Sequence, residues 1–237
     1  MAGVSLQGLF LSTGLFFTSV GAVCFWNRFP DDDSRFLQRT AGVVLGLCAS
    51  YQLWMAWTGG IHSYLAMRVV NPALVAHGVL DLLCDAPVVM SLGYIAGRTP
   101  LQMLRTTAII ATGHASLMVA AATPSAMRAT VLFLIGVPFM TEGTTELTHE
   151  LPRKAAALGD VNVRRAQMGT DLVAFSWFVV ATAEFLAMVH VLPLNFALPC
   201  IVACDMVGKM GGCHIIMNKR EAVVAANQHA LEDSSNT

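Results

Sequence analysis

Seven long apolar runs, separated by short charged or Pro/Gly-rich breaks, limit what this chain can fold into more than any other feature. They cover residues 4–26, 41–59, 71–95, 106–122, 126–146, 170–192 and 194–217. A helix needs about 20 mostly apolar residues to cross the hydrocarbon core of a bilayer, and it pairs its own backbone polar groups there. The sequence therefore predicts an all-α protein, a bundle of seven transmembrane helices.

The composition excludes several other classes of protein. Charged residues make up 12% of the 237, against about 25% in an ordinary soluble domain. The net charge is −1 without a basic cluster, so we expect no nucleic-acid partner. The six cysteines lie within apolar runs and lack the spacing of a metal site, and no set of nucleophile and base indicates an enzyme. We expect one membrane domain in the lipid bilayer, residues 1–220, and a short polar tail, residues 221–237.

The basic residues predict the orientation of the bundle. The breaks after the first, third and fifth runs, together with the tail, hold 11 of the 14 lysines and arginines. They are Arg28, Arg35, Arg39, Arg98, Arg105, Arg153, Lys154, Arg164, Arg165, Lys219 and Arg220. Cytoplasmic loops of membrane proteins carry such an excess. We therefore expect the N-terminus outside, the tail in the cytoplasm, and the protein in the plasma membrane.

Four ionisable residues stand out within the apolar runs: Asp81, Asp85, Asp205 and Lys209. Each costs about 2.5 to 3.5 kcal/mol to place in hydrocarbon, so each needs a partner or a purpose. Asp81 and Asp85 are four residues apart, as are Asp205 and Lys209, so each pair shares one face of its helix. A simple ion pair between the third and seventh helices is one interpretation. One aspartate would suffice for one lysine, however, and this chain has three.

In this spacing the sequence resembles the microbial rhodopsins. The resemblance depends on Lys209, Asp205 four positions before it, Asp81 six positions before Pro87, and the Pro-Leu-Asn segment at 193–195. In that family a lysine of the seventh helix forms a Schiff base with retinal, and aspartates of the third and seventh helices are its counterions. The resemblance thus implies that Lys209 binds all-trans retinal covalently, with Asp81 and Asp205 as counterions.

The resemblance implies roles for three further residues. Trp177 falls where the family places an aromatic ring against the polyene, although a tryptophan that only packs is the alternative. Gly113 falls near the family's ring pocket, or else is a helix-packing glycine. Asp85 falls where proton pumps have a threonine. We expect Asp85 to share a proton with Asp81 and to help set the colour.

Several positions depart from the pattern of the family's pumps. Gly78 stands where pumps have an arginine, and His77 either replaces that cation in part or simply packs. Leu92 stands in place of the carboxylate that returns a proton to the Schiff base. Glu184 interrupts an otherwise apolar run, so we expect it to face the protein interior.

These departures favour a photoreceptor that does not pump efficiently. Two alternatives stay open, because the surplus carboxylates of the third helix fit a light-driven ion pump, and the missing arginine at Gly78 fits a light-gated ion channel. We accordingly expect either an ion substrate or a signalling partner. The resemblance also implies a homo-oligomer.

Overall fold

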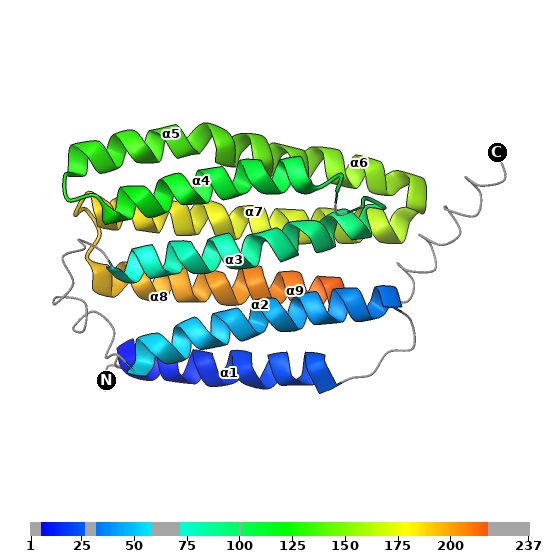
Figure 1. Cartoon of the computed structure of the whole chain (residues 1–237), viewed down its shortest axis with the longest axis horizontal. Helices are drawn as coiled ribbons and strands as arrows, with labels where there is room; N and C mark the ends of the chain where they lie inside the picture. Colours follow the sequence, from blue (N-terminus) through cyan, green and yellow to red (C-terminus); the bar gives the residue numbers. More distant parts are fainter. Residues whose placement is uncertain (1–5, 27–31, 58–71, 100, 218–237) are drawn as a thin grey trace.

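The protein is an all-helical bundle whose rods lie side by side (Figure 1). The computed structural model describes residues 6–26, 32–57, 72–99 and 101–217. The first four helices are α1 Leu6–Trp26, α2 Asp32–Trp57, α3 Pro72–Ile95 and α4 Leu104–Ala122. The fifth rod consists of α5 Ala126–Thr145, η2 Glu146–Glu150, α6 Leu151–Ala155 and η3 Ala156–Leu158. The sixth is α7 Asp160–Met188, and the seventh consists of α8 Leu194–Asp205, η4 Met206–Met210 and α9 Gly211–Met217. The predicted seven-helix, all-α fold is confirmed.

Three helices have bounds that differ from the prediction. The helix predicted at 41–59 begins at Asp32, and residues 58–59 lie outside the described part. The helix predicted at 126–146 continues to Leu158, and the one predicted at 170–192 covers Asp160–Met188. Hydropathy detects the part of a helix that lies in hydrocarbon, whereas the backbone stays helical where polar side chains reach the membrane surface. Over the described residues, the other helices agree to within two residues.

The predicted loop between the fifth and sixth helices was wrong. Arg153 and Lys154 lie in α6, and Arg164 and Arg165 lie in the second turn of α7. The rods are joined instead at Gly159, whose φ of 100° falls where residues with a Cβ are strained. A single glycine therefore reverses the chain where the predicted runs left residues 147–169 as a loop.

Five of the helical rods are long and apolar enough to cross a membrane, among the residues that the structure describes. They are Leu6–Cys24, Ala73–Ile95, Ala126–Leu158, Asp160–Met188 and Leu194–Met217. The protein is therefore an integral membrane protein. α2 and α4 complete the bundle between these rods, α2 against α1 and α3, and α4 against α3 and α5.

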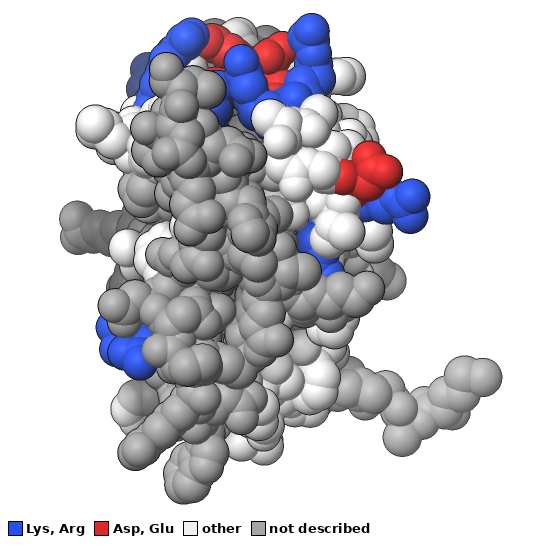
Figure 2. Space-filling view, turned by 90° about the vertical axis from the view of Figure 1, so that its right-hand side faces the viewer, with Lys and Arg blue, Asp and Glu red and all other residues white. Residues whose placement is uncertain are grey.

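Basic residues gather at one end of the bundle. The N-terminal parts of α2, α4 and α7, the residues after α3, and α6 all lie at the right-hand end of Figure 1. These segments carry Arg35, Arg39, Arg98, Arg105, Arg153, Lys154, Arg164 and Arg165. Figure 2 views this end and shows blue and red side chains along its upper edge. Which side of the membrane this end faces stays a prediction, as does the tail, which lies outside the described residues.

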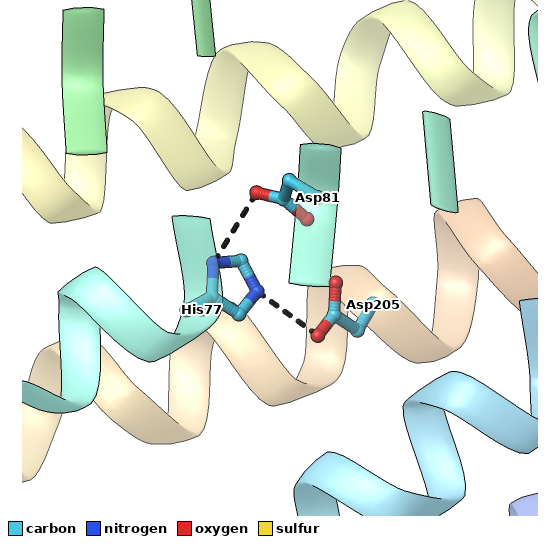
Figure 3. Close-up of side chains that lie close together, drawn as sticks. All are labelled: His77, Asp81 and Asp205. Atoms are coloured by element: carbon cyan, nitrogen blue, oxygen red, sulfur yellow. Dashed lines mark hydrogen bonds and ion pairs between the residues drawn. The ribbon is translucent and has the colours of Figure 1, made fainter. Parts of the chain in front are cut away.

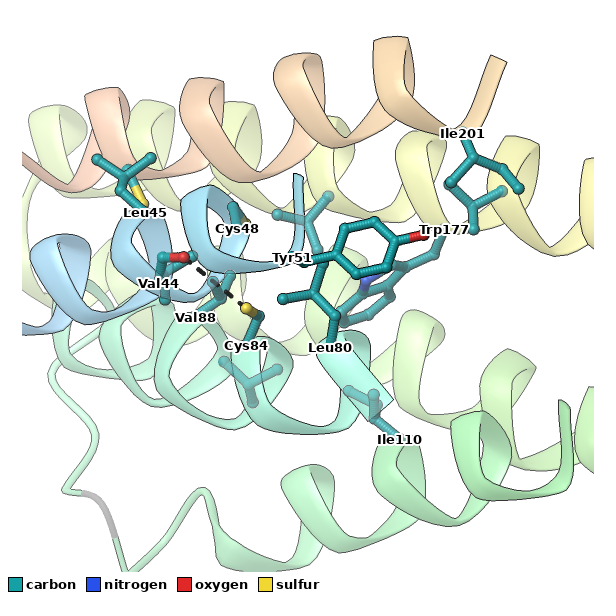
Figure 4. Packing of buried hydrophobic residues seen from close by; sticks show 14 of the residues in the cluster. Val44, Leu45, Cys48, Tyr51, Leu80, Cys84, Val88, Ile110, Trp177 and Ile201 are labelled. Carbon is teal, nitrogen blue, oxygen red and sulfur yellow. Dashed lines mark hydrogen bonds between the residues drawn. The ribbon is translucent and has the colours of Figure 1, made fainter. Parts of the chain in front are cut away.

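The helices pack around one apolar core. Figure 4 shows part of it, where Val44 and Cys48 of α2 lie against Cys84 and Val88 of α3. The Cys84 thiol donates to the carbonyl oxygen of Val44 at 3.9 Å, so this weak polar group is paired. The core continues past Tyr51 to Trp177 of α7, and there it meets the charged residues of the site.

Candidate functional site

Lys209 is buried at the centre of the bundle and bonded to two carboxylates. Its Nζ donates to Oδ1 of Asp81, on α3, and to Oδ1 of Asp205, at the end of α8, each at 2.6 Å. All three side chains are buried. A buried ion pair repays its desolvation only with such close geometry, and removing one partner typically costs about 3–5 kcal/mol. The arrangement therefore holds a positive charge at Nζ between two helices.

The turn that carries Lys209 has an unusual shape. Residues Met206–Met210 form a π-helical turn, η4, between α8 and α9. Such turns shift the helix by one residue and occur frequently at functional sites. Ser176 of α7 donates from Oγ to the carbonyl oxygen of Cys204 at 3.2 Å. A Cβ on Gly208 would lie only 2.3 Å from that Oγ. The close approach of α7 to the lysine turn therefore requires a glycine at 208.

His77 lies between the carboxylates on the other side from Lys209. Figure 3 shows its ring on α3, with Nε2 toward Asp205 and Nδ1 toward Asp81. Nε2 is 3.1 Å from Oδ2 of Asp205, and Nδ1 is 3.3 Å from Oδ2 of Asp81. Nδ1 is also 3.0 Å from Oε1 of Glu184, which is buried on α7 as predicted from the sequence. The ring of Tyr51 meets that of His77 edge-on, with centroids 5.7 Å apart.

A second histidine contacts the other helix-3 carboxylate. His114, buried on α4, places Nε2 3.0 Å from Oδ2 of Asp85 and Nδ1 3.7 Å from Oδ2 of Asp81. The contact between Nε2 of His114 and Oδ2 of Asp85 is a charge contact without the alignment of a hydrogen bond. Trp177 donates from Nε1 to Oδ1 of Asp85 at 3.2 Å, and its ring meets His114 edge-on at 5.5 Å. Asp85 is therefore held by α4 and α7 rather than by Lys209.

His77, Asp81 and Asp205 offer ligand atoms that all lie within 4.8 Å of one another. By distance alone these three could hold a metal ion. The ammonium of Lys209 already lies 2.6 Å from both aspartates, however, and its charge opposes that of a metal cation. The geometry therefore fits a salt bridge around Lys209 better than a metal centre.

A small pocket lies beside Lys209. Four of its eleven lining residues are charged, and three valines and a tryptophan supply apolar surface. Its lining residues are Asp81, Asp85, Val88, Val173, Ser176, Trp177, Val180, Cys204, Asp205, Gly208 and Lys209. The free volume is about 20 Å³, room for one water molecule. The pocket therefore places the charged residues next to apolar side chains around a space for one water molecule.

The structure brings together five of the six site residues predicted from the sequence: Lys209, Asp81, Asp85, Asp205 and Trp177 all line this pocket.

Gly113 does not line the pocket. A Cβ there would lie 2.6 Å from Sδ of Met140, and one on Gly136 would lie 3.1 Å from the Gly113 carbonyl oxygen. In this structure Gly113 thus lets α4 and α5 approach closely. Sequence reasoning missed His114, although a histidine within the fourth apolar run was a visible signal.

No protein-family model and no curated protein sequence matches this chain. Among solved structures, a cyanorhodopsin from the cyanobacterium Tolypothrix superposes with a TM-score of 0.77 at 16% identity, over 96% of this chain and 99% of that one. The light-driven proton pump of Coccomyxa subellipsoidea gives 0.77 at 13% identity, over 90% and 95%. The transmembrane domain and linker region of a rhodopsin phosphodiesterase from Salpingoeca rosetta gives 0.72 at 14% identity, over 98% and 76%. This chain has the seven-helix fold of the microbial rhodopsins.

Proposed function

We propose that this protein binds all-trans retinal through Lys209 and acts as a photoreceptor, with Asp81 and Asp205 as the counterions. The observation that carries this proposal is the buried Nζ of Lys209, 2.6 Å from both carboxylates, in a pocket also lined by valines and Trp177. An imine formed on a lysine stays protonated in a poorly solvated site only beside a carboxylate.

The residues of the pocket fit retinal in their chemistry. The pocket contains an amine and three acids, and Val88, Val173, Val180 and Trp177 offer apolar surface to a polyene. When bound, retinal would supply absorption of visible light and a positive charge at the Lys209 nitrogen. Because the free volume is about 20 Å³, binding requires side chains to move apart. Trp177, which holds Asp85 and contacts His114, is the largest of these side chains.

The chain's own residues favour a photoreceptor over an efficient pump. Leu92 is fully buried and can neither accept nor donate a proton. A Cβ on Gly78 would lie 2.9 Å from Cβ of Met118, so α4 occupies the space in which a long cationic side chain would begin. The site therefore stabilises a positive charge at Lys209, but positions 78 and 92 carry no side chain that would drive a proton in one direction.

A second candidate function is light-driven ion transport. It is favoured by the four buried carboxylates and two buried histidines in mutual contact, and by the likeness of the fold to a light-driven proton pump. We propose that the seven-helix domain has no enzymatic activity of its own. A photoreceptor of this kind needs a signalling partner, and we propose that it forms a homo-oligomer in the plasma membrane.

The proposal is tested by producing the protein with all-trans retinal and recording its visible absorption. Lys209→Ala should abolish the absorption band, because the amine is lost. Lys154→Ala is the matched control, since Lys154 lies exposed in α6 and should leave the band intact. A coloured Lys209→Ala protein would exclude the proposed attachment site.

Light-evoked current measured against voltage separates the modes of action. A photoreceptor should give no current. A current that never reverses would establish a pump, and one that reverses would establish a channel.

A further inference from the structure

Three groups form a continuous line that leads away from Lys209. Asp205 accepts from Nζ of Lys209 at Oδ1 and faces Nε2 of His77 with Oδ2, at 2.6 and 3.1 Å. On the far side of the imidazole, Nδ1 lies 3.0 Å from Oε1 of Glu184. Each separation is within hydrogen-bond distance. The line therefore connects the lysine nitrogen of η4 with a carboxyl group of α7, through α8 and α3.

We propose that Glu184 is a proton store, loaded from the Lys209 nitrogen through Asp205 and His77. The proposal rests on the retinal binding proposed above, because light must first change the charge at Lys209. It goes beyond that function in giving a role to two residues that retinal attachment does not use, His77 and Glu184.

Asp205 is the residue through which a proton can enter the imidazole and leave on its other side. Nε2 faces only Asp205 among the described contacts, whereas Nδ1 faces both Asp81 and Glu184. A proton that entered from Asp81 would arrive at the nitrogen that also serves Glu184, and the ring would not carry it forward. Entry at Nε2 and departure from Nδ1 use both nitrogens in sequence.

The transfer balances with one proton. His77 begins neutral, with its proton on Nδ1. Nζ of Lys209 gives a proton to Oδ1 of Asp205, and the carboxyl group turns and passes it to Nε2 of His77. Nδ1 then gives its proton to Glu184. Asp205 is again an anion, His77 is again neutral, and one proton has moved from Lys209 to Glu184. Return by the same route restores the starting state.

The surroundings of Glu184 favour storage over release. Its side chain is 6% exposed, so a proton delivered there from Nδ1 of His77 is shielded from loss to water. The groups that face its partner His77 are Asp81 on the same helix, Asp205 of α8 and the Tyr51 ring of α2. None of these lies between Nδ1 and Glu184, which are in direct contact.

The other histidine does not offer an equivalent route. Nδ1 of His114 is 3.7 Å from Oδ2 of Asp81, which is beyond hydrogen-bond distance. Its contact with Asp85 at 3.0 Å lacks hydrogen-bond alignment. The structure therefore assigns the relay to His77 and leaves Asp85 beside it as a separate acid.

Infrared difference spectra between light and dark test the proposal in the retinal-bound protein. The wild type should show a new C=O stretching band of a protonated carboxyl, which moves to lower frequency in D₂O. The band should be lost in Glu184→Gln and His77→Asn, and should persist at a changed frequency in Glu184→Asp. Glu142→Gln is the control, since Glu142 is an exposed partner of Arg105 on the outside of the bundle. A full band in Glu184→Gln would overturn the proposal.

A second measurement needs no retinal. In protein with ¹⁵N-labelled histidine, the ring-nitrogen signals of one residue should shift in Glu184→Gln, and the same signals should vanish in His77→Asn. Glu142→Gln should shift none of them. Unchanged histidine signals in Glu184→Gln would overturn the relay even if the pigment forms. If no visible pigment forms but the predicted histidine shifts are present, retinal binding is refuted and the contact between His77 and Glu184 is established.

Discussion

Replacing Gly208 with alanine should destabilise the protein and shift the absorption of its retinal-bound form. Gly208 is the residue before Lys209, and its Cα faces Ser176 of α7. An added Cβ would lie 2.3 Å from Oγ and 2.5 Å from Cβ of Ser176. Both distances are shorter than van der Waals contact allows, and Cβ of Ser176 is fixed to the backbone. The lysine turn or α7 must therefore move.

The magnitude follows from three opposing contributions. Alanine is favoured over glycine inside a helix by about 1 kcal/mol. Forcing an extra methyl group into a packed interior costs about 1–3 kcal/mol. Moving Ser176 also breaks its hydrogen bond to the Cys204 carbonyl, worth about 1 kcal/mol. The first and third contributions cancel approximately, so we expect a net loss of about 1–3 kcal/mol of unfolding free energy.

The assay is denaturant unfolding in detergent, with absorption spectra of the retinal-bound protein recorded in parallel. Gly46→Ala is the matched control, because nothing lies within 4 Å of a Cβ at this helical position in α2. It should be neutral or stabilising and should leave the spectrum unchanged. Ser176→Gly should rescue most of the loss in Gly208→Ala, because it removes both clashing atoms. The steric reasoning is wrong if Gly208→Ala is as stable as Gly46→Ala.

Three further predictions concern the charges of the site. Acidification of the retinal-bound protein should shift its absorption to the red, because protonating a counterion removes negative charge near the Lys209 nitrogen. The red shift should be largely lost in Asp81→Asn, and its midpoint pH should change in Asp85→Asn. An unaltered titration in both variants would contradict this prediction. Asp205→Asn should lower the unfolding free energy of the retinal-free protein by less than the about 3–5 kcal/mol typical of a buried charge left unpaired, because Lys209 loses one of its two carboxylate partners and keeps Asp81, and adding Lys209→Met should recover part of the loss. Steady light-driven acidification of the medium should be weak or absent because Leu92 is an inert aliphatic group, and acidification equal to that of a proton-pumping rhodopsin in the same cells would refute this.

The sequence predicts the number and order of the helices because lipid leaves few alternatives for an apolar run of this length. It does not predict where the helices end at the membrane surface. Asp32–Thr40 and Asp160–Gly169 carry polar side chains, which lower hydropathy without preventing a helix. A glycine at 159 with positive φ is equally invisible to hydropathy, since only the folded turn shows that this backbone angle is used.

The candidate site was predictable where its residues lie four apart on one helix. Asp205 and Lys209 illustrate this, because helical spacing alone places them on one face. Contacts between helices depend on how each helix is rotated about its axis, which one sequence does not give. For this reason His77 was predicted either as a partial substitute for a cation or as a packing residue but not as a link to Glu184, and His114 was not predicted at all.

The charge balance of the site explains why protons can move within it. Four carboxyl groups, Asp81, Asp85, Glu184 and Asp205, face three basic side chains, those of Lys209, His77 and His114. With His77 neutral, as at the start of the proposed relay, and the other six charged, the sum is −4 + 2 = −2, so the site has surplus negative charge that can accept a proton.

An arginine in place of Gly78 would supply a charge that no change in the site could remove, because its guanidinium stays protonated in proteins. Met118 leaves no room for that side chain, and the nearest basic group on α3 is instead the imidazole of His77. An imidazole can give up its proton near neutral pH. A change of charge at Lys209 can therefore be compensated by moving protons among neighbouring side chains, without exchange with either side of the membrane. Such a closed redistribution is compatible with the proposed photoreceptor, whereas a pump must also release the proton.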